Sequence, residues 1–128
     1  MLVKRRNRLS RSRDFDAVYR QGRSVATRYL VLYSFAREEE TGEEPRLGLA
    51  VGRQLGTAIE RNRLKRRLRS AFDEIHEQVP GGRDYVLIAR PGLPEAIAGR
   101  GFPWLVERVE EVFERSRTAE RAPAPPTS

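Results

Sequence analysis

Residues 29–36, YLVLYSFA, form an apolar run rich in aliphatic and aromatic side chains, which is typical of a strand. In an extended strand, the odd-numbered side chains of this segment lie on one side, and Leu30 and Leu32 lie on the other. The acidic stretch 38–45, EEETGEEP, contains glycine and proline and is typical of a loop exposed to solvent. Residues 46–51, RLGLAV, predict the next strand, and we expect two strands before the acidic loop.

A helical period replaces this alternation in residues 57–79. Pro80 and the two glycines after it end the predicted helix. Residues 84–89, DYVLIA, are almost wholly apolar, as expected of a strand that is covered on both faces. The apolar positions of the long helix are four, four, three and four residues apart and form one stripe, made of Leu64, Leu68, Phe72, Ile75 and Val79.

Helices are also predicted near both ends of the chain. Ser12 can cap a short helix that runs from about Arg13 to Gly22. The prolines and glycines of residues 91–99 predict a loop, after which Pro103 suits the first turn of a last helix. Four apolar side chains are expected on the buried face of that helix: Leu105, Val109, Val112 and Phe113.

The 128 residues are enough for one hydrophobic core. The composition of residues 118–128, TAERAPAPPTS, is typical of a disordered tail, so we expect one domain over residues 1–117. The predicted element order is α-β-β-β-α-β-α. This order indicates the α/β (α+β) class, as a single αβ sandwich of one sheet with helices on one face. The long helix links two strands, and the general rule makes such a crossover right-handed.

The formal charge is +7, and it is unevenly distributed. Residues 1–37 carry a net charge of +8, residues 61–69 carry +6, and the rest of the chain is negative. Two concentrated positive segments indicate a polyanionic partner. The chain has no cysteine, which excludes disulfides and thiolate chemistry and fits a cytoplasmic location. Its basic N-terminal segment has no continuous apolar run, so the sequence indicates no membrane partner.

The strongest signal is the run RNRLKRRLR at residues 61–69. Leucine interrupts the cations only where the apolar stripe requires it, so Asn62, Lys65, Arg66 and Arg69 lie on the side away from Leu64. Two alternatives compete with a polyanion site. An ordinary solvated helix face would normally intersperse acidic residues, and a helix lying on a membrane would carry aromatic residues within the basic stretch.

The segment from Gly56 to Phe72, GTAIERNRLKRRLRSAF, resembles the signature helix of the bacterial ribonuclease P protein, whose hallmark is Arg-Asn-Arg followed by further cations. Residues 9–22, LSRSRDFDAVYRQG, resemble the family's first helix, and residues 29–35 resemble its central strand. Residues 46–51 resemble the strand that leads to the signature. The last helix is similar in position and type only.

The resemblance implies a left-handed βαβ crossover, against the general rule. It also implies two RNA surfaces. One is a cleft for the 5′ leader of precursor tRNA, at Phe15, Tyr19 and Tyr33. The other is the signature helix, which lies near the catalytic RNA and carries Arg61, Asn62, Arg63, Lys65, Arg66 and Arg69. The protein would be the accessory subunit of a ribonucleoprotein endoribonuclease, with no catalytic residue or metal ligand of its own. Mg²⁺ would be held mainly by the catalytic ribonuclease P RNA, and no protein partner is evident.

The residues themselves leave alternatives open. Aromatic side chains flanked by arginines can stack on the bases of a single strand, but aromatic residues at helical spacing, such as Phe15, are also typical of a core. A structural RNA-binding protein of the ribosome would have a similar charge. An autonomous nuclease would need convergent carboxylates, and near the basic surface the sequence offers only Asp14 and Asp16.

Overall fold

The computed structural model describes residues 22–36 and 44–121. The helix predicted over residues 13–22 and most of the acidic loop lie outside the described residues. The final residues of the predicted tail, 122–128, lie outside them as well.

One four-stranded sheet forms the centre of the described structure, in the order β1-β2-β4-β3. Strand β4 pairs antiparallel with β2 and parallel with β3. The two predicted strands before the acidic loop are confirmed, and so is the crossover that joins β3 to β4 through the long helix. The strands are β1 (Arg23–Ala26), β2 (Leu30–Ala36), β3 (Arg46–Ala50) and β4 (Arg83–Ala89).

The alternation of β2 gives the sheet two different faces. Leu30 and Leu32 are completely buried on one face, as the sequence predicts, and Tyr33 and Phe35 are half-buried on the other. The polar Ser34 also lies on the first face, where its hydroxyl is within 3.4 Å of the Ser116 hydroxyl of the last helix. This contact gives a buried hydroxyl a hydrogen-bonding partner.

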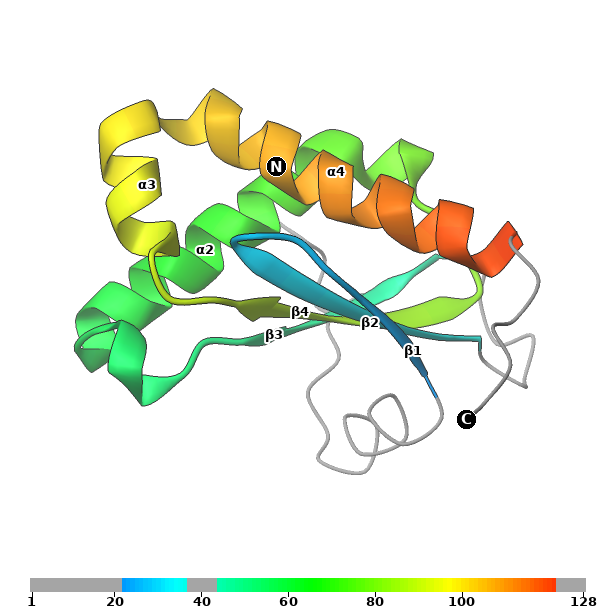
Figure 1. Cartoon of the computed structure of the whole chain (residues 1–128), viewed down its shortest axis with the longest axis horizontal. Helices are drawn as coiled ribbons and strands as arrows, with labels where there is room; N and C mark the ends of the chain where they lie inside the picture. The colour runs from blue at the N-terminus through cyan, green and yellow to red at the C-terminus, as the bar shows by residue number, and fades with distance from the viewer. Residues whose placement is uncertain (1–21, 37–43, 122–128) are drawn as a thin grey trace.

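Two long helices, α2 (Ala58–Ile75) and α4 (Phe102–Arg121), cover the same face of the sheet (Figure 1). The stripe predicted for α2 is buried, and Val79 just beyond it is buried as well. The predicted face of α4 is confirmed in the same way, because all four of its apolar side chains are at most 4% exposed. Two short 3-10 turns flank α2: η2 (Arg53–Leu55) and η3 (His76–Gln78).

The loop predicted over residues 91–99 is wrong, because Leu93–Arg100 form a helix, α3. Its N-cap, Gly92, has a φ of 95°, and Pro94 falls in the first turn, where a missing N–H costs nothing. Leu93 and Ile97, four residues apart, are both buried and supply the packing energy. The last helix continues to Arg121, past the predicted boundary at residue 117. That boundary stays a prediction.

On the face of the sheet opposite α2 and α4, an ion pair joins β3 to β4. Arg46 and Asp84 are partners in the parallel register. The guanidinium donates two hydrogen bonds to the carboxylate, from Nε at 2.7 Å and from Nη2 at 2.6 Å. The Asp84 side chain is 5% exposed, whereas that of Arg46 is 31% exposed. Paired hydrogen bonds of this kind fix both orientation and register.

We predict that Asp84→Asn lowers the free energy of unfolding by about 1–3 kcal/mol, because one charged partner of a partly buried pair is removed. Urea unfolding followed by circular dichroism measures the change. Glu74→Gln, which neutralises an exposed carboxylate on α2, is the matched control. Equal effects of the two substitutions would show that the Arg46–Asp84 pair contributes nothing.

Candidate nucleic-acid interface

The basic helix begins at a complete capping box. The hydroxyl of Thr57 accepts a hydrogen bond from the backbone N–H of Glu60 at 3.2 Å, and Oε1 of Glu60 accepts one from the backbone N–H of Thr57 at 3.0 Å. Gly56 precedes the cap with a φ of 138°, and a Cβ at this position would come within 3.1 Å of the Glu60 side chain. The glycine therefore allows the acidic side chain to fold back over the cap.

The capping interactions lower the pKa of Glu60. The main cause is the hydrogen bond from the backbone N–H of Thr57, followed by the bond with its side chain, and Arg63 adds a favourable charge. A lowered pKa in the folded chain means that the stabilising contribution is complete above the ordinary value of a glutamate. It disappears as the pH falls through the lowered pKa. The start of the basic helix is thus best fixed at neutral pH.

The six cations of residues 61–69 form what we call the basic face of α2. With 3.6 residues per turn, the buried stripe determines where each polar side chain points. Arg61 lies nearest the stripe, and its Nε is buried without a hydrogen-bonding partner among the described residues. The polar side chains form three strips along the helix: half-buried Arg61, Lys65 and Arg69, exposed Asn62 and Arg66, and exposed Arg63 and Arg67.

The basic face has little internal compensation. No acidic residue occurs between Glu60 and Asp73. Within the described part of the chain, Lys65, Arg66 and Arg67 form no ion pair. These three cations gain most from a partner that brings its own negative charge at regular intervals, as a nucleic-acid backbone does.

A second surface lies on the face of the sheet that α2 and α4 leave open. Val86 of β4 is completely buried at its centre, and half-buried Tyr33 and Phe35 pack against it together with Ala50 and Ile88. Tyr33 and Val86 are register partners, and Phe35 pairs with Asp84. We call this the open face. Two aromatic rings and the guanidinium of Arg46 lie on this face, and Asp84 holds the guanidinium in place through hydrogen bonds.

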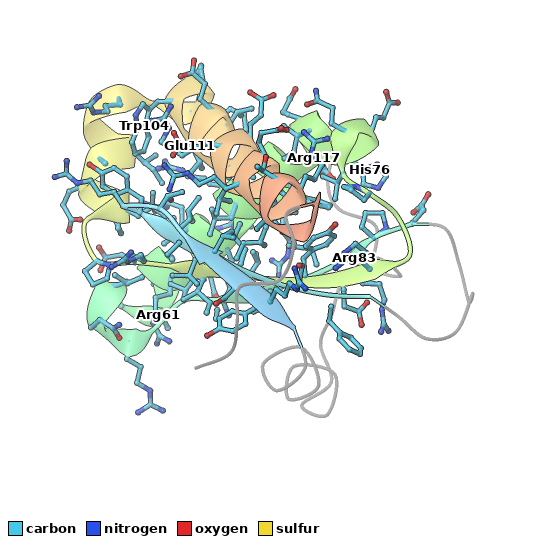
Figure 2. All side chains as sticks on the ribbon, turned by 45° about the vertical axis from the view of Figure 1, so that its right-hand side comes forward. Arg61, His76, Arg83, Trp104, Glu111 and Arg117 are labelled. Atoms are coloured by element: carbon cyan, nitrogen blue, oxygen red, sulfur yellow. The ribbon has the colours of Figure 1, made fainter. Side chains whose placement is uncertain are left out.

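The predicted site residues fall on these two surfaces as far as they are described. The signature residues occupy the first two-thirds of α2, on the helical side of the sheet, and Tyr33 lies on the open face. Phe15 and Tyr19 lie outside the described residues, so their place beside Tyr33 stays a prediction. Figure 2 shows Arg61 near one end of the molecule.

Sequence reasoning missed two members of the open face. Alternation already puts Phe35 on the same side as Tyr33, but the resemblance assigns only the tyrosine to a cleft. Arg46 gives no local signal, since a cation at the first position of a strand is common. Its role depends on Asp84, which is 38 residues away in the sequence.

The described residues include no group of three histidine, cysteine, aspartate or glutamate side chains that could hold a metal ion. Residues 22–36 and 44–121 also contain no helix that is long and apolar enough to cross a membrane. The basic face offers cations that suit phosphates, and the open face offers rings that suit unpaired bases.

The comparisons with known proteins agree on one family. Residues 3–117 match the family model described as Ribonuclease P. The ribonuclease P protein component of Symbiobacterium thermophilum is 41% identical over 119 residues, which cover 93% of this chain and 98% of that protein. The RNase P protein of Thermotoga maritima is similar in structure, with a TM-score of 0.75 at 31% identity over 84% of this chain and 96% of that one. A Staphylococcus aureus RNase P protein mutant with defective mRNA degradation activity has a TM-score of 0.73 at 28% identity, over 88% and 89% of the two chains.

We predict that Thr57→Ala lowers the free energy of unfolding by about 0.5–2 kcal/mol, because the helix loses its N-cap. Thr57→Ser keeps a hydroxyl in the same place and is the matched control. Urea unfolding measures both variants. If serine and alanine destabilise the protein equally, the capping hydroxyl does not hold the start of the basic helix.

Proposed function

Because the chain belongs to the ribonuclease P protein family, we propose that it binds the catalytic RNA of that enzyme and the 5′ leader of precursor tRNA. In this role it assists endonucleolytic removal of the leader, which gives the mature 5′ end of the tRNA. The family match weakens the alternative of a ribosomal RNA-binding protein, since the matching family model and the similar proteins named above are those of ribonuclease P.

The basic face of α2 is the observation that carries this proposal. Phosphate contacts by lysine and arginine supply most of the affinity for an RNA backbone and release its counterions. The guanidinium of an arginine can also bind a phosphate with two hydrogen bonds. Arg66, exposed between the two flanking strips, is best placed for such a contact. We assign the basic face to the catalytic RNA.

The open face supplies the second half of the proposal. An unpaired nucleotide is bound through stacking on aromatic rings and through cations along its backbone. Tyr33 and Phe35 offer rings, and the ion-paired Arg46 lies on the same side of the sheet. We assign this face to the leader of precursor tRNA.

We place the hydrolytic chemistry in the RNA subunit. Phosphodiester hydrolysis with Mg²⁺ uses several convergent oxygen ligands, and the described residues do not fit that requirement. Their exposed cations repel a divalent ion rather than collect it. RNA phosphates are suitable anionic ligands, so Mg²⁺ would be held mainly there. The lack of cysteine is compatible with the cytoplasm, where we propose that the complex acts.

We predict that the protein and its cognate RNA together cleave precursor tRNA at the mature 5′ end, and at a lower Mg²⁺ concentration than the RNA alone. The reason is that the basic face reduces repulsion between RNA strands. The assay compares protein alone, RNA alone and both together across a Mg²⁺ titration. Cleavage by RNA-free protein would contradict our assignment of the chemistry.

Arg66→Ala tests the basic face in the same assay. It should raise the Mg²⁺ requirement and make the slope of log affinity against log salt shallower by about 0.7–0.9, the value for one phosphate contact. Arg115→Ala removes the same charge from the far half of α4 and is the control. If the two variants have the same Mg²⁺ requirement and the same salt slope, α2 is not part of the RNA interface.

We predict that Tyr33→Leu weakens binding of precursor tRNA with a long leader by about 1–3 kcal/mol per stacked base. A substrate with almost no leader should be bound as tightly as by the unchanged protein. Tyr33→Phe keeps the ring and serves as the control for stacking. Equal weakening on the two substrates would exclude leader recognition by Tyr33.

A further inference from the structure

Two aromatic rings meet at the junction of α3 and α4, and neither belongs to the two surfaces described above. Gly101, with a φ of 88°, lies between the two helices and places Trp104 in the first turn of α4. The ring of Tyr29, from the turn between β1 and β2, meets Trp104 edge to face, with centroids 5.1 Å apart. Figure 2 shows Trp104 beside α3, at one end of the molecule.

Arginines from three different segments lie against these rings, and a fourth arginine is bonded to the turn that carries Tyr29. The guanidinium of Arg28 lies 5.2 Å from the centroid of Tyr29. Those of Arg100 and Arg108 each lie 5.7 Å from the centroid of Trp104. Arg90 joins the group through its backbone N–H, which donates to the carbonyl of Tyr29, and through Nη1, which donates to the carbonyl of Thr27. We call these residues the Trp104 cluster: Arg28, Tyr29, Arg90, Arg100, Trp104 and Arg108.

Most of this positive charge is uncompensated. Arg108 has acidic partners on its own helix, Glu107 at 3.6 Å and Glu111 at 3.8 Å. Arg28, Arg90 and Arg100 are exposed. Among residues 22–36 and 44–121, none of these three arginines forms an ion pair, and none pairs with Glu95 of α3.

Packing alone does not account for the cluster. Tyr29 and Trp104 are partly buried and pack against the core, which accounts for the buried part of each ring. A core needs no cations on its outer side, and none of these three arginines gains an acidic partner among the described residues. Arginines beside exposed parts of aromatic rings are, however, the combination that binds unpaired nucleotides: the ring stacks on the base and the guanidinium contacts the phosphate.

We propose that the Trp104 cluster binds an unpaired nucleotide of the catalytic RNA, which adds a third RNA contact to the two already proposed. The inference rests on the proposed function. It assigns the cluster to the catalytic RNA because α3 and the first turns of α2, which carry the basic face, lie at the same end of the molecule in Figures 1 and 2. One RNA can then follow a continuous path from α2 to the junction of α3 and α4.

The geometry allows an exchange of partners when the RNA binds. Arg100 is exposed, and its contact among the described residues is with the indole ring, so it can move to a phosphate while a base takes its place on the ring. Arg28 can do the same at Tyr29. Arg90 is anchored at the carbonyl of Thr27 and adds its positive charge to the cluster.

Trp104 is the single tryptophan of the chain, so intrinsic tryptophan fluorescence reports on this site alone. The full-length protein is titrated with the cognate catalytic RNA, and complex formation is followed independently by filter binding. We expect quenching of Trp104 emission and lower accessibility of the indole to acrylamide in the complex. A saturated complex with unchanged emission and accessibility would overturn the proposal. A change that arises only when precursor tRNA joins the preformed complex would overturn the assignment to the catalytic RNA.

Charge-neutralising variants separate this inference from the proposed function. Arg28→Gln combined with Arg100→Gln should make the salt dependence of binding to the catalytic RNA shallower by about 0.7–0.9 for each phosphate that is no longer neutralised. Arg115→Gln is the matched control and should leave it unchanged. Suppose that Arg66→Ala weakens binding of the catalytic RNA, whereas the double variant has the same affinity and salt dependence as the control. The Trp104 cluster then does not bind the RNA, and the proposed function stands. If Arg66→Ala also equals the control, the proposed basic face fails as well.

Ring substitutions test stacking directly. Trp104→Leu should weaken binding of the catalytic RNA roughly 5- to 150-fold, the equivalent of about 1–3 kcal/mol for one stacked base. Trp104→Phe should restore most of the affinity. Circular dichroism melting checks that each variant is folded, and if the leucine variant is not, the arginine variants decide. Equal affinity of folded leucine and phenylalanine variants would exclude stacking on Trp104.

Discussion

Burial of the apolar stripe of α2 against the sheet decides where the cations of that helix point. Leu64, Leu68, Phe72 and Ile75 are each at most 5% exposed, which is worth about 6–12 kcal/mol for four such side chains. The cations of the basic face form five pairs spaced three or four residues apart. Such pairs cost about 0.2–0.5 kcal/mol each, so burial outweighs their repulsion and the helix persists without interspersed acids.

The burial of apolar side chains also makes the two sides of the sheet different. Alternation along β2 sends Leu30 and Leu32 toward the helices and leaves Tyr33 and Phe35 on the open face, so a single strand contributes to the core and to a candidate binding surface. The basic face is consequently on the helical side and the aromatic surface on the other. A protein with two such sides can contact two RNA molecules at once, as the proposed function requires.

Features that repeat locally could be predicted from the sequence. The stripe of α2, the alternation of β2 and the buried face of α4 are periodic patterns, and each is confirmed. Helix α3 was missed because Pro94 and Gly99 are typical of loops, although Pro94 stands in the first turn, where the helix tolerates it. The crossover from β3 to β4 follows from the predicted element order, whereas the left hand that the family resemblance implies for it is signalled by no local pattern.

Contacts between distant segments could not be predicted in this way. The Arg46–Asp84 pair depends on the register of two strands separated by α2, and the Trp104 cluster on four segments that only the folded chain brings together. Arginine is 23 of the 25 cations, so its frequency alone marks no site. What distinguishes Arg28 and Arg100 is their position beside aromatic rings without an acidic partner among the described residues. Lysine at these positions would keep the charge but lose the planar group that stacks on a ring, so the arrangement favours a ligand with both bases and phosphates.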